Sequence, residues 1–210
     1  MVPLLEPDPG YALWAETYPP RAHNELMRVE QSAMMRLWSG LPVERALDAG
    51  TGTGRNLGLL ADQGVPARLG LDRSIAMLKR AGARGARLIC GDAAALPIAG
   101  DAFDLVLASL MAGDLPELSD LARFTREASR VLRRGGSLVY SDFHPTWAER
   151  NWQRTFDSAD GRKWRLPLHP HTLGDHRAAL DAAALETVAI EEPLLGDVPV
   201  LVVLRAVKLY

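Results

Sequence analysis

The chain has 210 residues, with 24 Lys and Arg against 26 Asp and Glu, so its formal net charge is −2. This length suits one domain with its own core, and 48% hydrophobic with 24% charged residues is typical of a folded globular protein. A net charge near zero gives no sign of the basic surface that binds long nucleic acid, although a local basic patch is compatible with it. We therefore expect no nucleic-acid partner.

The cysteine content and the length of the apolar runs indicate in which cellular compartment the protein is expected. Cys90 has no partner for an internal disulfide, and its place inside an apolar run predicts a buried, inert thiol. The longest apolar run, residues 198–204, has the length of a strand rather than of a membrane helix. The first nine residues lack the basic and apolar regions of a signal peptide. These features predict a cytoplasmic protein without a membrane partner.

The amino-terminal segment predicts two helices after a flexible start. Residues 1–10 hold three prolines and are expected to form a loosely tied arm. A short helix is expected over 11–18, where a proline pair stops it. Apolar residues at helical spacing then predict a second helix over 23–39.

From residue 43 the pattern changes to strands that alternate with helices. Strands are expected over 45–48, 68–72, 87–90, 103–109 and 136–142, and helices over 54–63, after Ser74 and over 119–133. The strands are continuously apolar rather than alternating, which is typical of a parallel sheet covered on both faces.

The last third of the chain has a different character. Residues 143–171 are rich in Trp, His and Arg, with Trp164 expected in a hairpin around Gly161. Thr172 and an acid three residues later form a capping box that opens a helix over 172–184. The two apolar runs that follow, 185–192 and 198–207, are close enough in sequence to pair antiparallel.

A glycine loop lies between the first strand and its helix. Asp48 precedes three alternate glycines, Gly50, Gly52 and Gly54, which allow a tight turn and a close approach of backbone N–H groups to a ligand. The dinucleotide pattern Gly-x-Gly-x-x-Gly is not met, because the sixth position from Gly50 is Arg55. An acid followed by three alternate glycines instead resembles motif I of the class I S-adenosylmethionine-dependent methyltransferases.

Further segments carry the same resemblance in the expected order. Asp72 ends the second strand, and the segments that resemble later family motifs are 71–78, 91–97, 103–106 and 131–136. The match is good over about residues 44–142 and holds in outline over 172–207, and it looks most similar to the small-molecule branch that includes ubiquinone- and menaquinone-biosynthesis enzymes. The resemblance implies an α/β, Rossmann-like fold with a seven-stranded, mostly parallel sheet. It further implies an antiparallel carboxyl-terminal strand pair and helices on both faces.

The resemblance also implies one methyltransferase domain over residues 1–210. Its parts would be an amino-terminal helical lid (1–42), a cofactor-binding core (43–142), a substrate-side insert (143–171) and a carboxyl-terminal helix with the strand pair (172–210).

S-adenosylmethionine is the cofactor that the family implies. Asp48 is expected to attract its cationic methionine end or to order the loop, Asp72 to accept the ribose hydroxyls, and Asp92 to meet the adenine edge. The alternative is that these acids only cap nearby helices. The expected cofactor-binding residues are Tyr18, Asp48, Gly50, Thr51, Gly52, Gly54, Asp72, Arg73, Met77, Asp92, Ala93 and Ser109.

The acceptor is expected above the carboxyl ends of the strands, under the insert, where aromatic residues suit a small apolar molecule. The expected contacts are Tyr11, Trp14, Met111, Trp147 and Trp152, with plain packing as the alternative role. His144 and Asp142 follow the fifth strand, where His144 is expected to act as a general base for a hydroxyl acceptor or to be a hydrogen-bonding wall residue. No spacing of histidines and carboxylates supports a metal site.

The predicted function is methyl transfer from S-adenosylmethionine to an O, N or C nucleophile of a small molecule. The alternative is a protein of the same fold that binds the cofactor but does other chemistry, or that serves as a non-catalytic partner subunit. The acceptor and the oligomeric state stay open.

Overall fold

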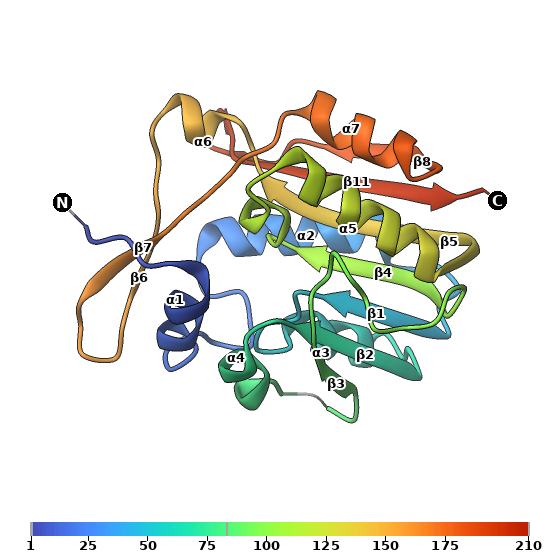
Figure 1. The fold of residues 1–210 in the computed structure, drawn as a ribbon, viewed down its shortest axis with the longest axis horizontal. Coiled ribbons are helices and arrows are strands. Elements are labelled where there is room, and N and C mark those ends of the chain that lie inside the picture. Colours follow the sequence, from blue (N-terminus) through green and yellow to red (C-terminus); the bar gives the residue numbers. More distant parts are fainter. Residues whose placement is uncertain (1, 83, 210) are drawn as a thin grey trace.

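The computed structural model describes residues 2–82 and 84–209 and is built on one central sheet (Figure 1). The strands of this sheet are β1 (Arg45–Ala49), β2 (Ala67–Asp72), β3 (Arg87–Cys90), β4 (Phe103–Ser109), β5 (Leu132–Phe143), β8 (Leu185–Glu191) and β11 (Leu201–Lys208). Their order is β3-β2-β1-β4-β5-β11-β8. Strand β11 runs antiparallel to both of its neighbours, and the other pairs are parallel. The predicted fold class is confirmed.

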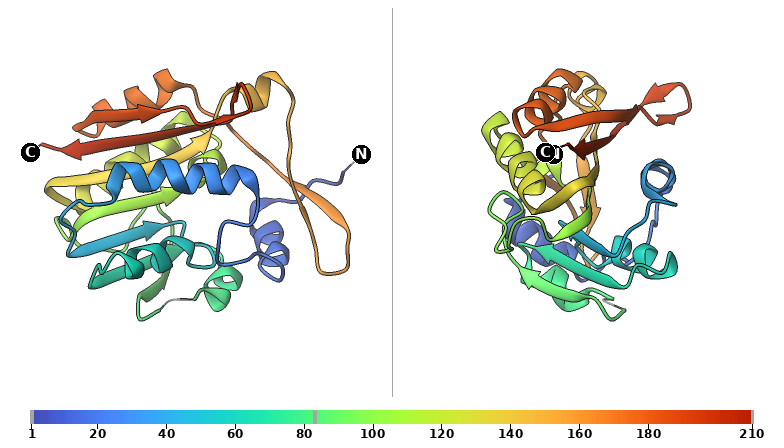
Figure 2. Two further views of the ribbon diagram at one scale, coloured as in Figure 1. Left: turned by 180° about the vertical axis from the view of Figure 1, so that it is seen from behind. Right: turned by 90° about the vertical axis from the view of Figure 1, so that its right-hand side faces the viewer.

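Helices cover both faces of the sheet (Figure 2). The main helices are α2 (Glu25–Trp38), α3 (Arg55–Asp62), α4 (Ile75–Arg80), α5 (Leu118–Val131) and α7 (Leu173–Ala182). Helices α2 and α3 pack on one face around Leu57 and Leu105, while α5 and α7 pack on the other around Phe124 and Tyr140. The continuously apolar strands are thus buried from both sides, as their pattern predicts.

Local signals place several helix starts correctly. The Ser74 side chain accepts a hydrogen bond from the Met77 backbone N–H at 3.3 Å, which caps α4. Thr172 and Asp175 form the predicted reciprocal box at the start of α7. Strand β5 begins earlier than predicted, because Leu132 already pairs with Phe103 ahead of an irregular register.

The amino-terminal prediction is wrong in two respects. Helix α1 spans Pro7–Trp14, so it starts and ends four residues earlier than predicted, with a proline in its first turn, where proline is tolerated. The preceding residues are not a loose arm. Leu5 N donates to Arg165 O at 3.0 Å, and Arg165 N donates to Pro3 O at 3.0 Å. The start of the chain is therefore tied to β7 (Lys163–Leu166).

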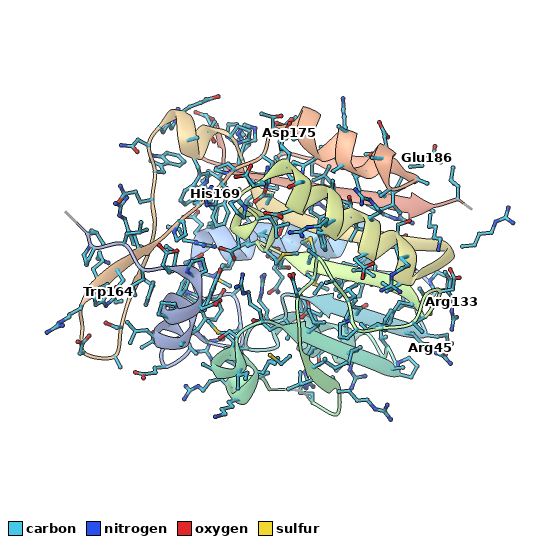
Figure 3. The ribbon with its side chains drawn as sticks, in the orientation of Figure 1. Arg45, Arg133, Trp164, His169, Asp175 and Glu186 are labelled. Atoms are coloured by element: carbon cyan, nitrogen blue, oxygen red, sulfur yellow. The ribbon has the colours of Figure 1, made fainter. Side chains whose placement is uncertain are left out.

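The insert after β5 forms a short helix and a hairpin. These elements are α6 (Thr146–Glu149), β6 (Arg154–Asp157) and β7, and smaller elements elsewhere are η1 (Ala112–Asp114), β9 (Leu194–Leu195) and β10 (Val198–Pro199). Trp164 lies in the hairpin as predicted, away from the sheet, and its Nε1 donates to Ser158 Oγ at 3.1 Å (Figure 3). The hairpin and α1 both lie beyond the carboxyl ends of the parallel strands.

The prediction of a buried Cys90 is wrong. Cys90 is exposed, because it is the last residue of β3, an edge strand with a neighbour on one side only. Its Sγ contacts the Arg73 carbonyl oxygen at 3.5 Å. A short apolar run does not distinguish an edge strand from a central one.

Truncation of the core next to β1 should test the two-faced packing. Leu105→Ala removes a fully buried side chain and is expected to lower the free energy of unfolding by about 2–5 kcal/mol. Leu194→Ala changes a side chain that is 51% exposed and should stay within about 0.5 kcal/mol of the wild type. Urea denaturation of both variants measures the difference, and equal losses would contradict the assigned burial.

Candidate active site

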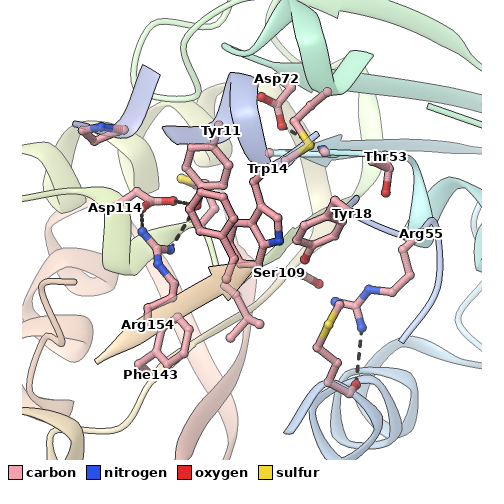
Figure 4. A pocket seen from close by; sticks show the side chains of 18 of the residues that line it. Tyr11, Trp14, Tyr18, Thr53, Arg55, Asp72, Ser109, Asp114, Phe143 and Arg154 are labelled. Carbon is pink, nitrogen blue, oxygen red and sulfur yellow. Dashed lines mark hydrogen bonds and ion pairs between the residues drawn. The ribbon is translucent and has the colours of Figure 1, made fainter. Parts of the chain in front are cut away.

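A cavity of about 700 Å³ lies at the carboxyl ends of the parallel strands (Figure 4). Its walls come from the glycine loop after β1, the ends of β2 and β4, helix α1 and the strand β6 of the hairpin. Open α/β sheets bind ligands at this edge, because the loops that follow neighbouring strands converge there. The fold thus brings segments that are far apart in the sequence around one space.

The glycine loop takes a path that side chains would oppose. Gly50, Gly52 and Gly54 have φ angles of 76°, 54° and 86°, in the region that favours glycine. The backbone N–H groups of Gly50 and Thr51 both donate to the Leu71 carbonyl oxygen, at 2.8 and 2.9 Å. The loop is therefore fastened to the end of β2.

Asp48 lies beneath the loop and is fully buried. Its carboxylate accepts hydrogen bonds from Thr51 Oγ1 at 2.6 Å and from Asn56 Nδ2 at 2.9 Å. Burial raises the pKa of Asp48 to about 6, although both hydrogen bonds oppose the rise. Among the described residues, Asp48 is not part of the cavity wall. Of the two roles predicted for it, the geometry therefore supports ordering of the glycine loop rather than direct attraction of the cationic end of the cofactor.

Asp72 ends β2 and faces the cavity. Its two oxygens accept hydrogen bonds from the backbone N–H groups of Gly52 and Ser74, both at 2.8 Å. Burial raises the pKa of Asp72, and these two bonds oppose the rise. A carboxylate has lone pairs for about two more bonds, so Asp72 can still accept two ligand hydroxyl groups. Helix capping and ligand binding are therefore compatible roles.

Aromatic side chains cover the other side of the cavity. Trp14 of α1 stacks on Phe156 of β6 with ring centroids 4.8 Å apart, which joins the helix to the hairpin. The Trp147 ring packs edge-on against Phe143 at 4.8 Å and against Trp152 at 5.5 Å. This half of the cavity is apolar, as suits a small organic molecule.

Several known proteins are similar to this chain. The family model of the methyltransferase domain matches residues 47–140. Malonyl-acyl-carrier protein O-methyltransferase of Methylococcus capsulatus is 43% identical over 110 residues, which are 50% of this chain and 39% of that protein. Demethylmenaquinone methyltransferase of Renibacterium salmoninarum is 37% identical over 110 residues, covering 51% of this chain and 45% of that protein. The chain thus spans less than half the length of these two relatives.

A solved structure extends the likeness over nearly the whole chain. The crystal structure of an S-adenosylmethionine dependent methyltransferase from Mesorhizobium loti matches with a TM-score of 0.70 and 25% identity, covering 86% of this chain and 98% of the other. Residues 47–140 thus match a methyltransferase domain, and the chain has the fold of class I S-adenosylmethionine-dependent methyltransferases.

Most residues predicted to bind the cofactor of this methyltransferase domain meet in the cavity. Those in its wall are Tyr18, Gly50, Thr51, Gly52, Asp72, Arg73, Met77, Asp92, Ala93 and Ser109. Gly54 lies outside this wall, where it ends the loop at the start of α3. The five residues predicted for the acceptor, Tyr11, Trp14, Met111, Trp147 and Trp152, also lie in the wall.

The structure places the predicted base elsewhere. His144 contacts Thr146 Oγ1 through Nδ1 at 3.1 Å and Glu192 Oε1 through Nε2 at 3.0 Å, so both ring nitrogens are engaged outside the cavity wall. Asp142 is fully buried next to His176, with 3.3 Å between Oδ2 and Nε2. Phe143, which lies between these two residues in the chain, is in the cavity wall, whereas Asp142 and His144 are outside it.

Sequence reasoning missed two polar groups of the site. Arg55 pairs with the fully buried Glu30 of α2 at 2.7 Å, and Glu30 also accepts a hydrogen bond from Ser141 Oγ at 2.7 Å. Asp114 and Arg154 pair within the cavity wall. The burial of Glu30 could have been predicted, because this acid lies on the apolar stripe of its helix. Nothing in the sequence around Asp114 and Arg154 predicts that they pair.

Two further properties of the described residues concern metal sites and membrane helices. Among residues 2–82 and 84–209, no cluster of three or more His, Cys, Asp or Glu side chains is arranged to hold a metal ion. Within the same ranges, every helix is too short or too polar to cross a membrane.

Gly50→Ala should damage the site, whereas Gly161→Ala should not. Both glycines have nearly the same φ, 76° and 78°, so each substitution should cost about 1–2 kcal/mol of stability. Only at Gly50 does a Cβ meet a neighbour, Met111 Cγ at 2.8 Å. We expect calorimetry to show weaker binding of S-adenosylhomocysteine to Gly50→Ala alone. Equal affinities of the two variants would contradict the close approach at Gly50.

The raised pKa of Asp48 predicts a pH dependence of stability. Because the pKa of Asp48 is about 6 in the folded protein, the group keeps its proton up to about pH 6, whereas the unfolded chain releases it near the ordinary pKa of 3.8. The group therefore stabilises the fold fully below about pH 4, and about 3 kcal/mol is lost as the pH rises through 6. Asp48→Asn should reduce this fall, measured by urea denaturation between pH 4 and 7. Asp62→Asn, at an exposed position, should leave it unchanged, and an unaltered fall in Asp48→Asn would refute the assignment.

Proposed function

We propose that this protein transfers the methyl group of S-adenosylmethionine to a nucleophilic atom of a small molecule. The observation that carries the proposal is Asp72, which lies in the cavity wall, is braced by two backbone N–H groups and keeps lone pairs free for a ribose. The glycine loop beside it leads into α3, whose first backbone N–H groups and helix dipole favour a carboxylate. Asp92 of the same edge is available for the adenine amino group.

The chain's own residues would catalyse chiefly by positioning and by excluding water. When bound, the cofactor supplies a sulfonium methyl group whose leaving group is already good. The aromatic wall would orient the acceptor in line with that methyl group, and the cover formed by α1 and the hairpin would keep water out. The printed name of demethylmenaquinone methyltransferase supports a small acceptor, and the names of the malonyl-acyl-carrier protein O-methyltransferases support transfer to oxygen.

The four parts predicted from the sequence fit this function as a proposal. Residues 1–42 and 143–171 would cover the site, 43–142 would hold the cofactor, and 172–210 would complete the sheet. The cytoplasmic location stays a prediction, as does the absence of a nucleic-acid partner.

Asp72→Asn tests the cofactor assignment. The substitution keeps the shape but replaces charge-assisted hydrogen bonds to the ribose by weaker ones, so affinity for S-adenosylhomocysteine should fall about 10- to 100-fold. Asp62→Asn, on an exposed carboxylate paired with Arg84, serves as control and should bind as the wild type does. Calorimetric titration measures both, and unchanged affinity in Asp72→Asn would remove Asp72 from the cofactor site. Cofactor binding without methyl transfer to any acceptor in a broad panel would favour a non-catalytic partner subunit.

A further inference from the structure

Three polar side chains from separate segments meet in the cavity wall (Figure 4). Tyr11 Oη of α1 donates to Asp114 Oδ2 of η1 at 2.5 Å. Arg154 of β6 forms an ion pair with Asp114 Oδ1 through Nη2 and donates from Nη1 to Tyr11 Oη at 3.0 Å. The carboxylate is thus held from two sides, by the lid helix and by the hairpin.

The cluster of Tyr11, Asp114 and Arg154 is largely buried, unlike an ion pair on the protein surface. The Arg154 side chain is 8% exposed and that of Asp114 is 16% exposed. Arg154 also lies 5.6 Å from the centre of the Tyr11 ring and donates to Pro167 O at 2.8 Å, so its position is fixed. Because Tyr11 and Arg154 each use one site on the carboxylate, Asp114 retains lone pairs for about two further hydrogen bonds. Its remaining exposure is to the cavity that it lines.

The cluster lies beside the glycine loop. The segment after β4 reaches the loop through Met111, whose Cγ would lie 2.8 Å from a Cβ at Gly50. Asp114 follows three residues later and shares the wall with Asp72, whose pKa the Asp114 charge helps to raise. The charged and titratable groups that interact with Asp114 are Tyr11, Tyr18, Asp72 and Arg154.

The other carboxylates of the cavity wall are proposed to bind the cofactor or lie in the exposed hairpin. Asp72 is braced by two backbone N–H groups and is proposed for the ribose, and Asp92, which accepts the Ala94 N–H at 2.8 Å, for the adenine amino group. Asp157 pairs with Lys163 at 2.8 Å, and both side chains are more than half exposed. Asp114 is therefore the wall carboxylate that remains for the acceptor.

We propose that Asp114 accepts a hydrogen bond from a hydroxyl group of the acceptor and takes its proton, so that the acceptor is a hydroxyl compound with an aromatic or apolar body and is methylated on oxygen. This inference rests on the proposed function and deepens it. Tyr11 and Arg154 are positioning residues that hold the carboxylate. A cationic ammonium acceptor is disfavoured because the buried Arg154 already balances the charge of Asp114.

The acceptor O–H proton passes to Asp114, and an oxygen lone pair forms the new bond to the methyl carbon. The bond between sulfur and that carbon breaks with its electron pair left on sulfur, which gives S-adenosylhomocysteine and a neutral ether. Asp114 then releases the proton to water. A hydroxyl needs such a base because it is a poor nucleophile until its proton leaves.

Two matched probes test the hydrogen bond without requiring turnover. 2-Naphthol and 2-methoxynaphthalene share a ring system, but only the first carries a hydroxyl donor. We expect the protein saturated with S-adenosylhomocysteine to bind 2-naphthol about 10- to 100-fold more tightly, as a charge-assisted hydrogen bond would give. Asp114→Asn should reduce this ratio about tenfold, and Tyr11→Phe, which keeps the ring, should reduce it several-fold. Asp62→Asn, on an exposed carboxylate that pairs with Arg84 outside the cavity wall, should leave the ratio unchanged.

Transfer of a labelled methyl group gives an independent readout. The wild type should form 2-methoxynaphthalene from 2-naphthol, and Asp114→Asn should form it at least about 100-fold more slowly while its affinity for S-adenosylhomocysteine is kept. Equal affinity for the two probes, an unchanged ratio in Asp114→Asn, or methylation of 2-aminonaphthalene in place of 2-naphthol would each overturn the inference while leaving the proposed function intact. Failure of the wild type to bind S-adenosylhomocysteine would instead overturn the proposed function.

Discussion

Two carboxylates at the ends of neighbouring parallel strands hold the glycine loop in a single backbone path. Asp48 of β1 bonds Thr51 and Asn56 from below, and Asp72 of β2 bonds Gly52 from the side. Because parallel strands end at the same edge, the sheet itself brings these two groups together. The site geometry depends on this loop, since Met111, which begins the segment that leads to Asp114, packs against it.

The cover of the cavity is built by pairing segments from opposite ends of the sequence. The first residues add to β7, Trp14 stacks on Phe156, and Thr17 Oγ1 donates to the Asp157 carbonyl oxygen at 3.0 Å. The lid helix and the hairpin therefore form one continuous roof rather than two independent flaps. A roof of this kind excludes water, which strengthens every charge interaction beneath it.

The predictable part of the structure was the part that local patterns specify. The acid and alternate glycines at residues 48–54 placed the loop, and apolar runs placed β1 to β4 within about one residue. The apolar pattern is clearest in β1 and β4, which lie inside the sheet and are mostly buried. Ser74 and Thr172 marked helix starts through their own hydrogen bonds.

What a single sequence could not supply was pairing at long range. The exposure of Cys90 depends on the position of β3 at the sheet edge, and the partners of Arg154 lie 143 and 40 residues away in the chain. The prediction for His144 had the same weakness, because its neighbour Glu192 is 48 residues distant. These contacts depend on strand order and on how the hairpin folds back, which residue spacing alone does not encode.

The most direct test of the account is calorimetric titration of the wild-type protein with S-adenosylmethionine, S-adenosylhomocysteine and NAD under the same conditions. The account predicts saturable binding of the first two, each at one site per chain, and none of NAD, because the alternate glycines do not form the Gly-x-Gly-x-x-Gly turn that holds a dinucleotide. Binding of NAD in place of the sulfonium cofactor and its product would contradict it.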